Sequence, residues 1–219
     1  MSKFALQAVN MVHGQLETNE VLNTDILQLL VDTPREDFVP PTLRGTAYID
    51  KDIEVSPGRY MLAPMTFAKL LELAEVTPSC RVLVIGDSNA YATAILSILG
   101  GHVVAIDSNV EMHAKALENA ARFKLKDVDF QQVKNMADGY AVSAPYDVIF
   151  INGAVKILPD ALTSQLGIGG RLVTIREVKK GLGKGILVRR LDGQVNIREY
   201  FDASTAVLEG FEESEQFVF

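Results

Sequence analysis

Residues 81–107, RVLVIGDSNAYATAILSILGGHVVAID, form the stretch that decides the fold. An apolar, β-branched run over 81–86 is followed by a helical pattern over 91–100 and a second apolar run over 102–107. Continuous apolar runs of this length, separated by a helix, are typical of parallel strands that are buried on both faces. The stretch therefore predicts a strand–helix–strand unit within an α/β fold.

The same alternation continues toward the C-terminus. Ser108 or Asn109 can cap the next helix, and further apolar runs alternate with one more helical pattern. We expect strands over 128–133, 146–153 and 168–176, and helices over 109–125 and 158–167. Residues 184–201 contain two strand patterns around Asp192-Gly193, which predicts an antiparallel hairpin with a type I′ turn. The expected sheet is mostly parallel and doubly wound, and it ends in an antiparallel hairpin.

The first third of the chain has helical patterns. Asn23 or Thr24 can cap a helix that ends at Pro34, and a second helix begins at Pro64. Prolines and turn residues between the two predict an irregular chain until Ile53. These N-terminal helices are expected to pack on the α/β unit.

The composition excludes several classes of protein. With 48% hydrophobic and 22% charged residues the chain can bury a core, and its formal net charge of −7 argues against binding to nucleic acid. A single cysteine, Cys80, excludes an internal disulfide, and the three histidines have no metal-ligand spacing. No apolar run reaches membrane-spanning length and the N-terminus lacks a signal-peptide core, so we expect a cytoplasmic protein without a membrane partner.

Gly86 and Asp107 form the candidate site in this pattern. A nucleotide-type cofactor needs a tight turn after the first strand, and an acid about twenty residues later that accepts hydrogen bonds from ribose hydroxyls. Gly86 ends the first apolar run and Asp107 ends the second. Asp107 can instead cap the next helix, but Ser108 and Asn109 are available for that role, so we assign Asp107 to the ligand.

Three longer stretches carry a further signal. They are GQLETNEVLNTDILQLLVDTPREDFVP (14–40), LLELAEVTPSCRVLVIGDSNAYATAILSILGGHVVAID (70–107) and APYDVIFINGAVKILPDALTSQLGIGGRLV (144–173). Their motifs, among them P-R-x-x-F-V-P, V-L-x-I-G and Q-L-x-x-G-G-x-L-V, resemble those of the protein-L-isoaspartate O-methyltransferases. The resemblance implies a Rossmann-like, S-adenosylmethionine-dependent methyltransferase fold with N-terminal helices. It implies a single domain over 1–219, in which the N-terminal part with the substrate loop, 1–78, packs on a core, 79–219.

The resemblance implies a reaction as well as a fold. A family member moves a methyl group from S-adenosylmethionine to the α-carboxylate of an L-isoaspartyl residue in a damaged protein or peptide. The carboxylate is already a nucleophile, so catalysis consists mainly of positioning. We expect the cofactor to contact Gly86, Asp87, Ser88, Asn89, Tyr91, Asp107, Asn135 and Asn152.

The loop after the first strand departs from the family pattern, acid-x-G-x-G-x-G. Val84 stands at the acid position, and Ser88 and Ala90 stand at the second and third glycine positions, so only Gly86 matches. A side chain where glycine had a positive φ costs about 1–2 kcal/mol or forces another turn. Asp87 adds a negative charge that we expect to repel the methionine carboxylate.

The substrate loop and the third motif depart as well. The family's T-I-S-Q-P is YMLAP here, with Leu62 at the serine position. Arg59 and Tyr60 can supply a cation and a hydroxyl for catalysis, or be a surface arginine and a packing tyrosine. The family's G-D-G motif, whose acid faces adenine, aligns with residues 134–136, where Asn135 can still accept a hydrogen bond.

Two functions from different classes follow. The whole-chain resemblance predicts an active methyltransferase with a remodelled loop. The three departures predict instead a catalytically silent member that keeps the fold as a binding or scaffolding protein. A changed ligand is a third hypothesis, since fold alone does not determine function. Within the site, Tyr91 can pack rather than line the pocket, and Asp138-Gly139 can replace Asn135.

Overall fold

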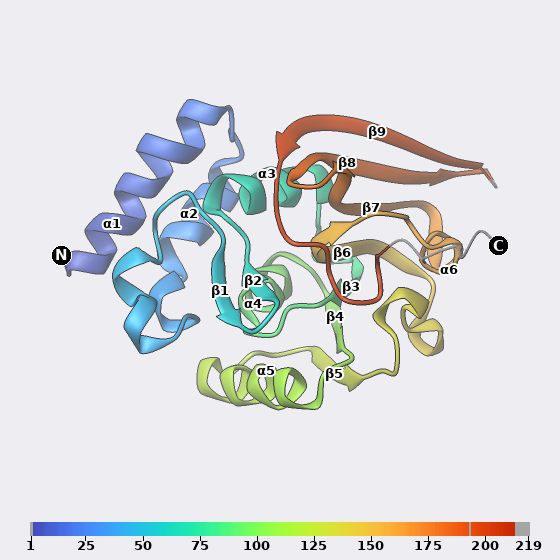
Figure 1. The fold of residues 1–219 in the computed structure, drawn as a ribbon, viewed down its shortest axis with the longest axis horizontal. Helices are drawn as coiled ribbons and strands as arrows, with labels where there is room; N and C mark the ends of the chain where they lie inside the picture. The colour runs from blue at the N-terminus through green and yellow to red at the C-terminus, as the bar shows by residue number, and fades with distance from the viewer. Residues whose placement is uncertain (1, 193, 213–219) are drawn as a thin grey trace.

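The computed structural model describes residues 2–192 and 194–212 and is built around a seven-stranded sheet (Figure 1). In order across the sheet, its strands are β5 (Val128–Gln132), β4 (His102–Asp107), β3 (Arg81–Ile85), β6 (Tyr146–Val155), β7 (Leu166–Lys179), β8 (Leu182–Leu191) and β9 (Gln194–Ala203). The first five strands in this order are parallel to one another. β8 pairs antiparallel with β7, and β9 pairs antiparallel with β8. The predicted mostly parallel sheet with a C-terminal antiparallel hairpin is confirmed.

Side chains of the central strand β3 face two different cores. Val82 and Val84 belong to the core on one face and Leu83 and Ile85 to the core on the other, and all four are fully buried. Because β4 and β6 both run parallel to β3, the carboxyl ends of the three strands meet at one edge of the sheet. This edge is where a ligand site is expected in such a fold.

Four helices connect and cover the strands. They are α3 (Pro64–Ala74), α4 (Tyr91–Leu99), α5 (Val110–Phe123) and α6 (Asp160–Ser164). Helix α3 contacts β7 and β8, and α4 and α5 cross between the first parallel strands. Of the two residues predicted to cap α5, Asn109 does so, because its side chain accepts from the N–H groups of Glu111 and Met112.

The helix predicted over 158–167 is shorter than expected. α6 stops early, and β7 begins directly after Gln165. The carbonyl of Gln165 accepts from the N–H of Tyr146 (2.9 Å), and its side-chain oxygen accepts from the N–H of Tyr140 (2.8 Å). Contacts with the sheet and the neighbouring loop therefore replace the last turn of this helix.

The N-terminal part contains two helices and a small hairpin. Helices α1 (Lys3–Met11) and α2 (Thr24–Asp32) lie together at the left of Figure 1, and Asn23 caps α2. The hairpin consists of β1 (Ile53–Ser56) and β2 (Arg59–Met61). A π-helical turn spans Val12–Leu16, and short 3₁₀ segments span Glu17–Asn19, Arg35–Asp37, Pro41–Thr46, Met136–Asp138 and Ala141–Ser143. The region predicted to be irregular before Ile53 thus includes two 3₁₀ segments.

The predicted C-terminal hairpin is formed by β8 and β9, with Leu191 opposite Gln194. The predicted type I′ turn depends on Gly193, which lies outside the described residues. None of the helices in the described ranges combines the length and the apolar character needed to span a membrane.

Arg35 joins the N-terminal part to the α/β unit. Its side chain is fully buried, and its guanidinium donates to the carbonyl of Ala47 (2.7 Å) and to that of Leu62. The guanidinium also lies 5.0 Å from the centre of the Tyr91 ring, a cation–π contact. One buried cation therefore links the segment after α2, the loop after β2 and the first turn of α4.

Replacing Arg35 by methionine should lower the free energy of unfolding by about 2–4 kcal/mol, because two buried carbonyls lose a charged donor. Arg35→Lys should also destabilise, since a single ammonium cannot reproduce the planar fork over Tyr91. Urea unfolding measures both effects. Arg198→Met, at an exposed position on β9, is the matched control. Equal stability of Arg35→Met and wild type would contradict this role.

Candidate functional site

The loop from Gly86 to Ala90 joins β3 to α4 at the carboxyl edge of the sheet. Gly86 (φ +77°) and Ala90 (φ +60°) have a left-handed backbone, whereas Ser88 does not. The N–H of Ala90 donates to the carbonyl of Asp87 (3.1 Å) and closes the turn. The first and third positions of the family pattern thus have a glycine-type conformation here, and the second, Ser88, does not.

Asp87 is directed at the start of α4. Its Oδ2 accepts from the N–H of Thr93 (2.6 Å) and from the Thr93 hydroxyl (2.7 Å). Burial raises the pKa of Asp87 to about 6, although the hydrogen bonds from Thr93 act in the opposite direction. In this conformation the carboxylate satisfies the first turn of α4, and its effect on a methionine carboxylate stays a prediction.

Asp107 lies at the end of β4, as predicted, and is almost fully buried. Its Oδ1 accepts from the N–H of Asn109 (2.9 Å), and its Oδ2 accepts from the hydroxyl of Ser88 (3.2 Å). The side chain of Asn109 supplies the cap of α5, so Asp107 is not needed for that purpose. The loop after β3 and the end of β4 are therefore joined through the acid assigned to the ligand.

Arg59 reaches the same acid from β2. Its guanidinium lies 3.5 Å from Asp107 Oδ1 and 2.9 Å from Glu209 Oε2, and the side chain is 6% exposed. The interpretation of Arg59 as a surface residue is therefore wrong. Asn152, at the rim predicted from β6, donates to the carbonyl of Tyr60 (3.3 Å). The structure thus places Arg59 beside Asp107, and Asn152 beside the carbonyls of Tyr60 and Gly86. We call this part of the carboxyl edge, around Gly86, Asp107 and Asn152, the cleft.

Other predicted residues point elsewhere. Tyr91 packs in the core, 5.3 Å from the rings of both Phe38 and Phe67, as the alternative interpretation expected, and its contact with the cofactor stays a prediction. Asn89 donates to the carbonyl of Phe38 (3.1 Å), on the side of the N-terminal part. Leu62, at the family's serine position, is buried and has no side-chain donor.

Asn135 occupies the start of a 3₁₀ segment. Its Oδ1 accepts from the N–H of Ala137 (3.1 Å), and its amide donates to Asp138 (3.1 Å). A Cβ built on Gly210 would lie 2.8 Å from Asn135 Oδ1, so the C-terminal chain passes directly beside this side chain. Asn135 and the alternative Asp138-Gly139 are therefore neighbours in one turn.

Sequence reasoning missed the segment that follows β9. Residues 206–211 return across the carboxyl edge, where Leu208 and Phe211 are buried. A Cβ on Gly86 would lie 2.5 Å from Leu208 Cδ2, so the leucine side chain lies directly on the turn that ends β3. The sequence does contain a signal for this packing, because Leu208 and Phe211 are large apolar residues that follow the last strand among acidic and small residues.

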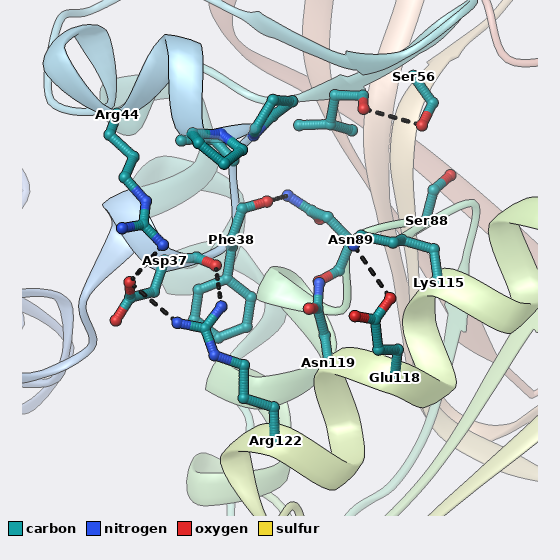
Figure 2. A pocket seen from close by; sticks show the side chains of 14 residues that line it. Asp37, Phe38, Arg44, Ser56, Ser88, Asn89, Lys115, Glu118, Asn119 and Arg122 are labelled. Atoms are coloured by element: carbon teal, nitrogen blue, oxygen red, sulfur yellow. Dashed lines mark hydrogen bonds and ion pairs between the residues drawn. The ribbon is translucent and has the colours of Figure 1, made fainter.

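The space left beside the two acids is very small. The void that Asp87 and Asp107 line measures about 10 Å³. A larger cavity of about 270 Å³ lies on the other side of Ser88 and Asn89, where Figure 2 shows the Asp37 carboxylate between two arginine side chains. That polar cavity was also not predicted.

The family model described as protein-L-isoaspartate(D-aspartate) O-methyltransferase matches residues 7–200. This chain belongs to that family. The protein-L-isoaspartate O-methyltransferase of Koribacter versatilis is 30% identical over 177 residues, which are 79% of this chain and 78% of the relative. The enzyme of the same name from Methylorubrum extorquens is 36% identical over 166 residues, 74% of this chain and 71% of the relative.

Solved structures of the family have the same fold. One protein-L-isoaspartate O-methyltransferase superposes with a TM-score of 0.78 at 22% identity, over 93% of this chain and 67% of that chain. Another, described as such an enzyme from Plasmodium falciparum in complex with S-adenosyl-L-homocysteine, has a TM-score of 0.78 at 16% identity, over 96% of this chain and all of that chain (100%). The predicted family and methyltransferase fold are confirmed.

The cleft was tested for its fit to S-adenosylmethionine. The void that Asp87 and Asp107 line together with Ala105, Phe130 and residues of α5 measures about 10 Å³, whereas ligand pockets measure roughly 300–1,000 Å³. Leu208 covers Gly86, and both carboxylate oxygens of Asp107 have protein partners. The residues present therefore do not fit the cofactor while residues 206–211 lie in the cleft.

Ala90→Gly should raise the free energy of unfolding by about 0.5–1 kcal/mol, because it relieves a side chain held at positive φ. Ser88→Gly is the matched control: Ser88 has no positive φ and loses its bond to Asp107, so stability should fall by about 1 kcal/mol. Urea unfolding of both variants decides. A gain from Ser88→Gly as large as that from Ala90→Gly contradicts the assigned loop geometry.

Asp87→Asn should stabilise the protein in a pH-dependent manner. A carboxyl group whose pKa is raised by folding favours the native state while it is protonated, and this stability is lost as pH rises through about 6. The stability of Asp87→Asn relative to wild type should therefore increase by about 2 kcal/mol between pH 4 and pH 7.5. Urea unfolding across this range measures it, and a difference independent of pH would count against the raised pKa.

Proposed function

We propose that this chain is an S-adenosylmethionine-dependent carboxyl methyltransferase that acts on L-isoaspartyl residues of proteins or peptides. The family match over residues 7–200 and the names of the relatives support the proposal. The observation that carries it is the meeting of Gly86 and Asp107 at the neighbouring ends of β3 and β4. In folds of this class a nucleotide-type cofactor binds at such a place, on a tight turn and a ribose-binding acid.

The proposal requires the cleft to open. Leu208 lies on Gly86 and has to move away before a cofactor can reach that turn. In this reaction the protein mainly has to position the substrate carboxylate, because a carboxylate is ionised near neutral pH and needs no base. We assign that positioning to Arg59 and Tyr60.

Arg59 is suited to a substrate carboxylate by its chemistry. A buried guanidinium binds carboxylates through paired hydrogen bonds, and Arg59 already contacts Asp107 and Glu209. Release of Glu209 would leave donors of Arg59 free at the cleft. Leu62 has no group that can contribute, so the hydroxyl lost at that position has to come from elsewhere, for which Tyr60 is the nearest candidate in the chain.

A second candidate is a family member that no longer binds the cofactor. The position of Leu208 on Gly86 and the side chains at Ser88 and Ala90 favour it. The two candidates differ in one measurable property, since only the first requires the chain to bind S-adenosylmethionine.

The activity test uses radiolabelled S-adenosylmethionine and two peptides that differ only in an isoaspartyl or an aspartyl linkage. We expect a base-labile methyl ester on the isoaspartyl peptide alone. Asp107→Asn should reduce kcat/KM about 10- to 100-fold through weaker cofactor binding, since a charge-assisted hydrogen bond contributes about 1.5–3 kcal/mol.

Asp129→Asn is the control for charge, because Asp129 is an exposed acid on the neighbouring strand β5. It should retain wild-type activity. Absence of labelled ester, together with absence of binding to S-adenosylmethionine at millimolar concentration, would overturn the proposal and leave the second candidate.

A further inference from the structure

The segment after β9 follows an unusual path. Beyond Ala203 the chain turns back and crosses the carboxyl ends of the central strands, seen in red in front of β6 and β3 in Figure 1. Ala154 of β6 accepts from the N–H of Leu208 (2.8 Å) and donates to the carbonyl of Ala206 (3.0 Å). Lys156 donates to the carbonyl of Phe211 (3.0 Å). The segment therefore pairs with the end of β6 through a single parallel bridge between Ala154 and Val207.

Its apolar side chains fill the cleft. Leu208 lies on Gly86 and on Gly153, to whose built Cβ atoms it comes within 2.5 and 3.2 Å. Phe211 is 1% exposed and joins the core on the same face of the sheet. The backbone of Gly210 passes beside Asn135. The segment thus covers Gly86, the turn predicted for the cofactor, and passes beside Asn135, the residue predicted to face adenine.

An ion pair between Arg59 of β2 and Glu209 holds the middle of the segment against the sheet edge. Glu209 Oε2 lies 2.9 Å from the Arg59 guanidinium, which is also 3.5 Å from Asp107 Oδ1. The Arg59 side chain is 6% exposed, whereas that of Glu209 is 66% exposed. The buried cation therefore has one internal partner and one partner that can leave into water.

The attachment of this segment differs from that of the core strands. β3 is hydrogen-bonded to a strand on each side, while residues 206–211, in the described part of the chain, make backbone–backbone hydrogen bonds outside the segment only to Ala154 and Lys156, at the end of β6. Ala206, Glu209 and Gly210 are exposed. Segments with few hydrogen bonds and an exposed side open locally at a lower free energy than the surrounding core.

We infer that residues 204–212 form a detachable intramolecular lid on the cleft, fastened by Arg59 and Glu209, and that lid and cofactor exclude each other. The exclusion rests on the proposed function, whereas the detachment stands on the contacts of the segment itself. Opening exposes the turn at Gly86 and frees one face of Arg59 in a single step. The lid thereby couples access of the cofactor to access of a substrate carboxylate.

Hydrogen exchange followed by mass spectrometry tests the detachment without any ligand. In the full chain, peptides from 204–212 should exchange at least about tenfold faster than peptides from β3, because local opening precedes global unfolding. Glu209→Gln should accelerate exchange of the segment a further 2- to 5-fold, because it removes an ion pair whose stabilisation corresponds to about that factor. The exchange of β3 should not change. Exchange of 204–212 at the rate of β3, unaffected by Glu209→Gln, would falsify the lid.

Titration with S-adenosylhomocysteine tests the exclusion. Leu208→Ala/Phe211→Ala should bind it at least about tenfold more tightly than wild type, because two large side chains no longer compete for the cleft. Leu191→Ala/Tyr200→Ala, two half-exposed residues on the β8–β9 hairpin, is the matched control and should bind as wild type does. Bound ligand should also accelerate exchange of 204–212 while it protects residues 86–90.

The outcomes separate the lid from the proposed function. Equal affinity of wild type and Leu208→Ala/Phe211→Ala overturns the exclusion. Local opening of 204–212 with no binding of S-adenosylhomocysteine by either protein supports the lid and overturns the proposed function. If Leu208→Ala/Phe211→Ala does not fold, Glu209→Gln takes its place in the titration, with an expected gain of about 2- to 5-fold.

Discussion

The cleft of this protein depends on the parallel hydrogen bonding of β3 between β4 and β6. Parallel pairing places the carboxyl ends of three strands side by side, so residues distant in the chain meet there. Gly86 extends the pairing by donating its N–H to the carbonyl of Ile106 (3.0 Å) before the backbone turns. The positions of Asp107 and Asn152 relative to that turn then follow from the pairing of the strands.

A second constraint is the need of a buried cation for anionic partners. Arg59 is almost fully buried, and leaving such a charge unpaired is costly. Asp107 and Glu209 together satisfy it, one from the sheet and one from the C-terminal segment. The acid that the fold offers to a ribose is therefore also a counter-ion, and any ligand at this edge has to compete with interactions inside the chain.

The sheet could be predicted from the sequence because its strands are continuous apolar runs. The strands containing Val82 and Val103 were predicted within a residue of their observed bounds, since burial on both faces leaves a local signal. The helix predicted over 158–167 was wrong at its end, where the side chain of Gln165 bonds to a loop that no local pattern reveals. Local sequence patterns thus predicted that the helix is present, and tertiary contacts decided where it ends.

The candidate site was predictable only in part. Gly86 and Asp107 lie where the spacing of strand ends placed them, because that spacing is a property of the strand–helix–strand unit. The direction of the Asp87 carboxylate and the burial of Arg59 depend on Thr93 and Glu209, partners that sequence reasoning did not identify.

By itself, the sequence determined the parallel sheet, the family and the edge of the sheet where a ligand site is expected, since all three follow from local periodicity and short motifs. Only the tertiary structure decided whether that edge is open. Leu208 and Gly86 are far apart in the chain, and their contact results from the return of the C-terminal segment across the sheet. No local pattern encodes such a contact, because it requires the packing of elements that have already formed.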